Sequence, residues 1–415
     1  MCLLLSCIGF SCSSSSEISN SVYIWQRNWS PEVGVSIDTL GKEVNDFIVL
    51  AGSVDYLNGK LSVSKVNINW TELSKVKNEV VVAFRINTRV KKLLADGKSQ
   101  VVVQATSMLA KECSRLAKEV GVSIAGVQFD YDCPTLKLKD YAVFVKDVRP
   151  YLGEYKISIT ALPTWLGNNS FKDLARATDY YVLQLHSFEV PKTINSKRQI
   201  FLKDKALSYV KKANRLKHPF SIALPTYGYE VGFDNKGKFL GLRAESEPIF
   251  WKNQAQVVRE YSSSQEVLDF IRKLKKHSFN NLKEVCWFRM PIKGDEFNWS
   301  IKTLLALLED RMPLKIIKMR LDCSESGLCE VFAENQGEDN IVGRMSFDVK
   351  LDSGLNFYYD VSMPYRGKFN NETKGLSVEG PTPKVDQSIL VCWLRGLEGH
   401  EDIKPIVSKV VFDEK

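Results

Sequence analysis

Polar side chains recur every second residue in the segment from Gly126 to Pro134, which reads Gly-Val-Gln-Phe-Asp-Tyr-Asp-Cys-Pro. Side chains of a β-strand alternate between its two faces, so Gln128, Asp130 and Asp132 are expected to point to the same side. Two carboxylates this close repel each other, and the repulsion raises the pKa of one of them. General acid catalysis needs a carboxylic acid that stays protonated near neutral pH. We therefore predict that Asp132 and Asp130 are catalytic groups.

Each of these carboxylates also has a structural interpretation. Asp132 can cap the helix that follows or accept hydrogen bonds from loop amides. Asp130, which is expected to lie deeper, can instead belong to a polar network inside the fold. The sequence leaves both alternatives open.

The elements that must position this segment are short apolar runs that alternate with amphipathic stretches between residues 21 and 312. Near-continuous apolar strands separated by helices indicate an α/β fold with a parallel sheet buried on both faces. Eight such units suit a closed (β/α)₈ barrel of the TIM type. A doubly wound open sheet is the alternative, but no glycine-rich phosphate-binding turn follows the first strand. The expected strands are Val22–Trp29, Phe47–Val54, Val80–Asn87, Ile124–Asp130, Lys156–Leu162, Tyr180–His186, Phe220–Tyr227 and Glu284–Arg289.

The pattern changes after Met312 and Pro313. Short runs with strand-like composition are then separated by Gly, Asn, Asp, Ser and Pro, which predicts an antiparallel β-sandwich over residues 313–415. Cys323 and Cys329 flank Ser-Glu-Ser-Gly-Leu, a spacing that can close a hairpin, and we treat them as a candidate disulfide. The expected strands are Leu314–Leu321, Cys329–Ala333, Met345–Leu351, Phe357–Ser362 and Ile389–Leu394.

Further polar and aromatic residues stand at the ends of the other expected barrel strands. Active sites of (β/α)₈ barrels form at the carboxyl ends of the strands, so these residues are expected at one mouth. Carboxylates, amides, arginines and aromatic rings together suit a carbohydrate ligand. The candidate substrate-binding residues are Arg27, Trp29, Arg85, Gln128, Trp165, Gln184, His186, Tyr227, Tyr229, Glu230, Trp287 and Arg289.

Several of these candidates carry a second interpretation. Glu230 is either a second carboxylate across the mouth or a solvated loop residue. His186 either contacts the ligand or is a hydrogen-bonded structural histidine. Arg27, Arg85 and Arg289 either bind an anionic group of the ligand or neutralise the two aspartates.

The amino terminus resembles the end of a bacterial lipoprotein signal peptide. An apolar stretch is followed by Ser11, Cys12 and four further serines, although no basic residue precedes it. Residues 1–20 are therefore expected to be a signal and tether, with lipidation at Cys12 or, alternatively, at Cys7. The resemblance implies a lipid anchor in a membrane of the bacterial cell envelope and leaves open which face carries the protein.

Other classes of ligand find little support. The net charge is +8, but lysines and arginines are interspersed with acids, as on a solvated mixed surface. We find no nucleic-acid-binding motif. The four histidines and nine cysteines show no zinc-ligand spacing, so neither a metal nor another cofactor is expected.

The segment that ends at Pro134 resembles the fourth-strand motif of family 18 glycoside hydrolases, the chitinase group. That motif runs Asp-Gly-hydrophobic-Asp-hydrophobic-Asp-hydrophobic-Glu. The resemblance implies that Asp132 stands at the catalytic glutamate and Asp130 at the aspartate that orients the substrate acetamido group. Gln128 then replaces the first aspartate of the stack. An aspartate in place of the glutamate shortens the acid by one methylene group, and small misplacements of catalytic groups are costly.

The same resemblance extends to two other strands. Trp287 resembles the tryptophan that forms the floor of the sugar pocket in that family. Gln184 lies near the family's Met-x-Tyr motif, whose tyrosine is absent here.

A second resemblance covers residues 22–300. The strings Val-Gln-Phe-Asp-Tyr-Asp-Cys-Pro, Ile-Thr-Ala-Leu-Pro-Thr-Trp-Leu and Gln-Leu-His are similar to a bacterial family of exported or lipid-anchored barrels described as a domain of unknown function. This resemblance implies a fold and no activity. We expect a glycoside hydrolase that acts on an envelope glycan through carboxylate acid/base chemistry. The alternative is a non-catalytic carbohydrate-binding or scaffold protein on a degenerate barrel.

Overall fold

The computed structural model describes most of the chain after residue 17. Cys7 and Cys12, the candidate lipidation sites, lie outside the described residues. Within them, no helix is long and apolar enough to cross a bilayer. The described residues are 18–95, 97–186, 191–196, 198–201, 203–244, 251, 255–325, 327–351, 356–396, 405–408 and 410–414.

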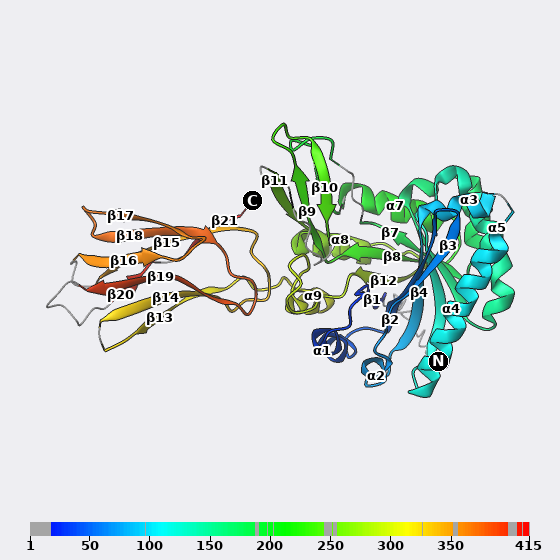
Figure 1. The fold of residues 1–415 in the computed structure, drawn as a ribbon, viewed down its shortest axis with the longest axis horizontal. Coiled ribbons are helices and arrows are strands. Elements are labelled where there is room, and N and C mark those ends of the chain that lie inside the picture. The colour runs from blue at the N-terminus through cyan, green and yellow to red at the C-terminus, as the bar shows by residue number, and fades with distance from the viewer. Residues whose placement is uncertain are drawn as a thin grey trace, which may run out of the picture.

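Eight parallel strands form a closed barrel (Figure 1). Each strand pairs with the next one along the chain, and the first strand also pairs with the last, so this sheet has no free edge. The predicted (β/α)₈ barrel is confirmed. The strands are β1 (Ser19–Ile24), β2 (Asp46–Leu57), β4 (Glu79–Ile86), β5 (Ile124–Asp130), β6 (Lys156–Ala161), β7 (Tyr180–Gln184), β8 (Phe220–Pro225) and β12 (Leu282–Phe288).

Helices cover the outside of the barrel, and the largest apolar core lies between helices and strands. On β5, Val127 and Phe129 point outward into this core, whereas Gln128 and Asp130 point inward. The alternation that the sequence suggested for β5 is therefore present. The helices are α1 (Pro31–Leu40), α2 (Trp70–Leu73), α3 (Lys91–Ala95), α4 (Ser99–Glu119), α5 (Leu138–Leu152), α6 (Asn169–Arg176), α7 (Lys203–Arg215), α8 (Ser264–Lys275) and α9 (Ile301–Leu308).

Two antiparallel additions were not anticipated from the sequence. Strand β3 (Lys60–Lys65) folds back on the long end of β2. Between β8 and α8, the chain forms a separate sheet from β9 (Gly228–Phe233), β10 (Phe239–Arg243) and β11 (Gln256–Tyr261), which projects from the barrel in Figure 1. Tyr229 and Glu230, which were expected at the mouth, therefore belong to this other sheet.

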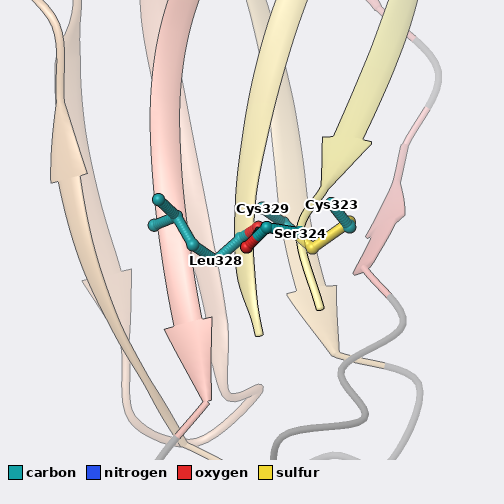
Figure 2. Close-up of a disulfide and its surroundings, with 4 residues drawn as sticks. All are labelled: Cys323, Ser324, Leu328 and Cys329. Atoms are coloured by element: carbon teal, nitrogen blue, oxygen red, sulfur yellow. Dashed lines mark hydrogen bonds between the residues drawn. A yellow bond between two sulfur atoms is a disulfide. The ribbon is translucent and has the colours of Figure 1, made fainter. Parts of the chain in front are cut away.

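The carboxyl-terminal part consists of two antiparallel sheets that share one apolar core. The disulfide between Cys323 and Cys329 joins the paired ends of two strands, and Ser324 also donates a hydrogen bond to the carbonyl of Leu328 across the same turn (Figure 2). One sheet holds β13 (Ile317–Cys323), β14 (Leu328–Asn335), β19 (Ser388–Gly396) and β16 (Phe357–Val361). The other holds β17 (Arg366–Asn370), β18 (Gly375–Pro381) and β15 (Gly343–Leu351), with β20 (Pro405–Val407) and β21 (Val411–Glu414) both paired to β15.

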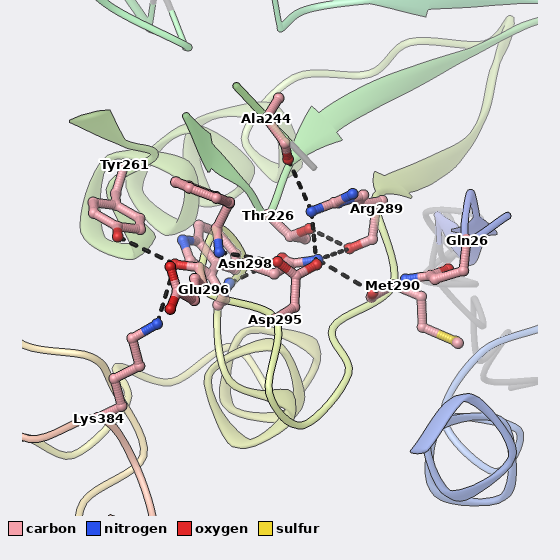
Figure 3. Close-up of polar contacts among 12 residues, drawn as sticks. Gln26, Thr226, Ala244, Tyr261, Arg289, Met290, Asp295, Glu296, Asn298 and Lys384 are labelled. Carbon is pink, nitrogen blue, oxygen red and sulfur yellow. Dashed lines mark hydrogen bonds and ion pairs between the residues drawn. The ribbon is translucent and has the colours of Figure 1, made fainter. Parts of the chain in front are cut away.

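Polar contacts join this part to the barrel. The Ser264 hydroxyl at α8 donates to the buried carboxylate of Asp339 over 2.8 Å. Ser300, which caps α9, donates to the carbonyl of Glu338 over 2.6 Å. Lys384 reaches the carbonyl of Glu296 over 3.2 Å (Figure 3). The two parts are therefore held together by buried as well as exposed hydrogen bonds.

The outward face of β5 allows a test of this packing. Phe129 is fully buried, with its ring 5.2 Å from that of Phe144. We expect Phe129→Ala to lower the free energy of unfolding by about 3–5 kcal/mol, because it leaves a cavity between strand and helix. Denaturant unfolding measures the change, and Leu136→Ala is the control because that side chain is 94% exposed. Equal effects of the two substitutions would contradict the described packing.

Candidate functional site

A cavity of about 120 Å³ lies at the carboxyl ends of the barrel strands. Asp130, the last residue of β5, and Asp132 both line it, so the strand that carries the acidic motif delivers them to one place. The cavity is lined by Tyr23, Trp25, Arg85, Asp130, Asp132, Thr160, Gln184, His186, Ala223 and Phe288.

A wider outer hollow of about 420 Å³ shares six of these residues with the inner cavity, so the two adjoin. The shared residues are Trp25, Arg85, Asp132, Gln184, His186 and Phe288, and the outer hollow adds Leu162, Tyr227, Ala244 and Arg289. The mouth therefore narrows from an open outer space to a small inner one with Asp130 in its wall.

Burial and a neighbouring carboxylate both change the pKa of Asp130. Burial, followed by repulsion from Asp132, raises the pKa of Asp130 to about 6, although Arg85 and a hydrogen bond from Thr160 act in the opposite direction. The Thr160 hydroxyl donates to Asp130 Oδ1 over 2.8 Å, and Arg85 is the register partner of Asp130 on β4. Near neutral pH, Asp130 can therefore either accept a hydrogen bond or hold a proton.

Asp132 has a different environment. Its side chain is exposed and forms no hydrogen bond or ion pair with the residues that the structure describes. It caps no helix among these residues either, since the turn after it begins beyond Pro134. This carboxylate is therefore free to meet a ligand in the mouth.

Gln128 lies below the cavity and does not line it. The Tyr23 hydroxyl donates to Gln128 Oε1 over 2.7 Å, and Gln128 Nε2 donates to the Ser158 hydroxyl over 3.2 Å. All three side chains are inside the barrel, where an unpaired polar group is costly. The predicted role of Gln128 in binding substrate is thus corrected to support of the cavity floor from beneath.

Aromatic rings form one wall of the mouth. The ring centroid of Phe288 lies 5.4 Å from that of Tyr23, 5.3 Å from that of Trp25 and 4.8 Å from that of His186, on which it stacks. Burial lowers the pKa of His186 to about 4, so this imidazole is neutral at physiological pH. Its Nδ1 lies 3.3 Å from the hydroxyl of Tyr227.

The loop that follows Phe288 is held by side chains that bind its backbone (Figure 3). Thr226 donates to the carbonyl of Arg289, and Asn298 Nδ2 lies 3.1 Å from the carbonyls of both Arg289 and Met290. The guanidinium of Arg289 lines the outer hollow but is bound to Asp295 at 2.6 Å. These contacts fix the position of the aromatic wall.

The three predicted tryptophans lie elsewhere. Trp287 points outward, donates to Asn20 Oδ1 over 3.0 Å and packs near Trp299, so it belongs to the core between barrel and helices. Trp165 is buried in the same core, and the half-buried Trp29 packs against this core. The expectation that Trp287 floors a sugar pocket is wrong, because strand alternation places the next residue, Phe288, in the cavity.

Three further candidates are also outside both hollows. Glu230 lies in β9, where it accepts hydrogen bonds from Trp251 Nε1 at 2.6 Å and Arg259 Nε at 3.0 Å, so it is no second carboxylate of the mouth. Tyr229 is buried in the small apolar core of that sheet. Arg27 is exposed beyond the end of β1, which finishes at Ile24 rather than at residue 29.

The structure thus brings together half of the predicted site. Sequence reasoning missed Tyr23, Trp25 and Phe288, although alternation along the first and last strands carries a signal for them. The predicted residues that line a hollow are Arg85, Asp130, Asp132, Gln184, His186, Tyr227 and Arg289. Among the described residues, no group of three or more histidines, cysteines or acids could hold a metal ion.

A family model described as a domain of unknown function (DUF3142) matches residues 78–293, just over half of the chain. The chain belongs to this family. The matched region runs from the start of β4 to beyond β12 and includes Arg85, both aspartates, His186 and Phe288. The family's domain therefore contains most of the residues that line the mouth.

Several solved structures are similar to this chain. A chitinase from Chromobacterium violaceum is 10% identical, with 71% of this chain and 98% of that chain covered and a TM-score of 0.50. The spore cortex-lytic enzyme SleL of Bacillus megaterium is 13% identical, with 71% and 74% covered and a TM-score of 0.44. A family 18 chitinase from Flavobacterium johnsoniae is 12% identical, with 71% and 93% covered and a TM-score of 0.44. No curated protein matches the sequence. At these identities the likeness concerns the fold alone.

The raised pKa of Asp130 predicts a dependence of stability on pH. Between about pH 4 and pH 6 the folded protein holds more protons on this group than the unfolded chain, so the free energy of unfolding falls as pH rises through this window. Asp130→Asn removes this loss and should raise the free energy of unfolding at pH 7 by about 2 kcal/mol, with little effect below pH 4.

Denaturant unfolding at pH 7 and below pH 4 measures this effect. Asp38→Asn on the exposed face of α1 is the matched control. A loss of stability that is equal at both pH values would mean that Asp130 serves only as an acceptor for Thr160.

Proposed function

We propose that the barrel mouth binds and hydrolyses a glycan, with Asp132 as general acid and base and Asp130 as the group that orients the substrate. The observation that carries this proposal is the pair of carboxylates that one strand delivers to a cavity walled by aromatic rings. Sugar rings present apolar faces to aromatic side chains and hydroxyl or amide groups to carboxylates. The shared fold of the Chromobacterium violaceum chitinase is consistent with it.

The position of the acids favours one class of mechanism. Asp130 ends β5 and Asp132 follows it by two residues, and the other described residues that line the two hollows include no further acid. Glycosidases with two working carboxylates place them on opposite sides of the scissile bond. With both acids on one side, the nucleophile is best supplied by the substrate, as in substrate-assisted hydrolysis. A 2-acetamido sugar carries such a nucleophile in its amide oxygen.

In this mechanism, the proton that Asp130 holds passes to Asp132, which donates it to the glycosidic oxygen while the acetamido oxygen attacks the anomeric carbon. The leaving sugar departs with that proton, and a cyclic cation remains bound. Asp130 binds the amide N–H of the acetamido group and stabilises the cation. Asp132, now ionised, then takes a proton from the water that opens the ring and returns it to Asp130, which restores both carboxyl groups to their starting states.

The substrate class that follows is a glycan with N-acetylated amino sugars. We place it in the bacterial cell envelope, in line with the lipid anchor that the amino-terminal sequence implies. The shorter reach of Asp132, compared with a glutamate, favours a second possibility, in which the mouth binds such a glycan without cleaving it.

The role of Asp132 is tested by substitution. Asp132→Asn should reduce hydrolysis of N-acetylglucosamine oligosaccharides by at least about a hundredfold, because the amide cannot donate the proton. The melting temperature should stay close to that of the wild type, since the side chain is exposed. Mass spectrometry of the products measures turnover, with Asp38→Asn as the control. Undiminished hydrolysis by Asp132→Asn would exclude the residue as the acid. Binding without hydrolysis by the wild type would leave the non-catalytic alternative.

Removal of the acetyl group from the substrate tests whether the substrate supplies the nucleophile. We expect oligosaccharides whose amino sugars have been de-N-acetylated to be hydrolysed at least about a hundredfold more slowly than their acetylated counterparts, because the intramolecular nucleophile is lost. Comparable rates for the two would point to a nucleophile from the protein. Such a result would overturn the substrate-assisted mechanism even if Asp132 proved essential.

A further inference from the structure

A groove of about 600 Å³ lies on the outside of the barrel, between α6 and α7 and the turn after β6. Its floor includes the half-buried ring of Tyr209, and the ammonium group of Lys212 lies 6.0 Å from the centre of that ring. The groove is lined by Pro163, Thr164, Leu166, Gly167, Lys172, Tyr209, Lys212, Arg215 and Leu216.

The charges of this groove are all of one sign. Lys172, Lys212 and Arg215 line it together with no acidic residue, and none of the three forms an ion pair with the residues that the structure describes. Lys211 and Lys217 flank it, exposed and likewise without such a partner. A concave cluster of unpaired cations concentrates positive potential and attracts anions.

On two other helices of the barrel, cations form ion pairs with acids. Arg115 on α4 pairs with Glu112 and Glu119 of its own helix. Arg272 and Lys275 on α8 both bind Asp310 at 2.8 Å. These cations are neutralised by nearby acids, whereas the three cations that line the groove between α6 and α7 are not.

Consecutive residues line the outer hollow of the mouth and the groove. Leu162 lines the outer hollow, and the next two residues, Pro163 and Thr164, line the groove. The short turn after β6 (Pro163–Trp165) therefore separates the two spaces.

We propose that this groove binds the anionic part of a glycan, namely an acidic polysaccharide strand whose carboxylates pair with Lys172, Lys212 and Arg215. The ring of Tyr209 packs against a sugar face between these charges. A concave groove suits a single polymer strand better than it suits a flat surface. An anionic membrane fits less well, because no strongly exposed large apolar side chain lines the groove for insertion. Binding of an N-acetylated glycan in the mouth belongs to the proposed function. Binding of an acidic strand in the groove does not depend on it.

The test measures binding of polygalacturonate, an acidic polymer, to the full chain by isothermal titration calorimetry at about 50 mM and about 200 mM salt. Methyl-esterified polygalacturonate has the same backbone without the charges and serves as the matched ligand. We expect binding of the acidic polymer, weakened by salt, and no binding of the esterified one. The triple variant Lys172→Gln, Lys212→Gln and Arg215→Gln should bind the acidic polymer roughly tenfold more weakly.

The matched control removes the same charge elsewhere. Lys42, Lys60 and Lys236 are exposed and form no ion pair with the described residues, so their triple replacement by Gln should change binding by less than about twofold. Equal weakening by both triple variants would overturn the proposal, because the net charge alone would then account for binding. Binding to phosphatidylglycerol vesicles together with no binding of the polymer would overturn it in favour of a membrane surface.

Failure of the proposed function can be distinguished from failure of the groove proposal. The groove variant should hydrolyse a short N-acetylglucosamine oligosaccharide at the wild-type rate, because such a substrate occupies the mouth alone. Polymer binding that depends on the three cations, in a protein that hydrolyses no glycan, would support the groove and exclude the hydrolase.

Discussion

Closure of the barrel between β1 and β12 is the constraint on which the site depends. The register pairs Val22 with Trp287, and both side chains lie in the outward core. Because side chains alternate along each strand, Tyr23 and Phe288 must then point inward, which puts their rings 5.4 Å apart at the mouth. A shift of one residue in this pairing would exchange the inward and outward sets and replace the aromatic wall. The chemistry of the mouth is thus a consequence of one strand register.

Polar groups inside the barrel illustrate how access, rather than pKa alone, identifies the site. Burial raises the pKa of Glu284 to about 7, which is the same direction as for Asp130. Glu284, however, is buried among Ser221 and Cys286, each 3.4 Å from its carboxylate, and lines neither of the two hollows. Asp130 has a comparable burial cost but lies in the wall of an open cavity. Only this second carboxylate can exchange a hydrogen bond with water for one with a ligand.

The sequence was sufficient to predict the barrel, the carboxyl-terminal antiparallel sheets and the inward direction of Asp130. Apolar strands and amphipathic helices have periods that are written in the chain itself, and all eight barrel strands were found from them. The inward direction of Asp130 needed only alternation within one strand. Trp287 shows where this reasoning ends, because a tryptophan suits either the outer core or a sugar pocket, and the choice between them depends on pairing with a distant strand. Glu230 shows a second limit. Its partner Arg259 lies on β11, and nothing in the local pattern signals that hairpin sheet.

If the mouth and the groove bind one glycan strand, as proposed above, their opposite charges impose a direction on that strand. Above about pH 6 Asp130 is mostly ionised and repels carboxylates, and the repulsion between unit charges a few ångströms apart reaches several kcal/mol where solvent is partly excluded. An acidic sugar is therefore disfavoured next to the scissile bond. Lys172, Lys212 and Arg215 attract the same acidic sugar to the far side of the turn after β6. A glycan that alternates neutral N-acetylated residues with acidic ones satisfies both sites at once, whereas a uniformly charged strand satisfies only the groove. Selection of the sugar that enters the mouth then follows from the charge pattern of the strand as well as from the shape of the cavity.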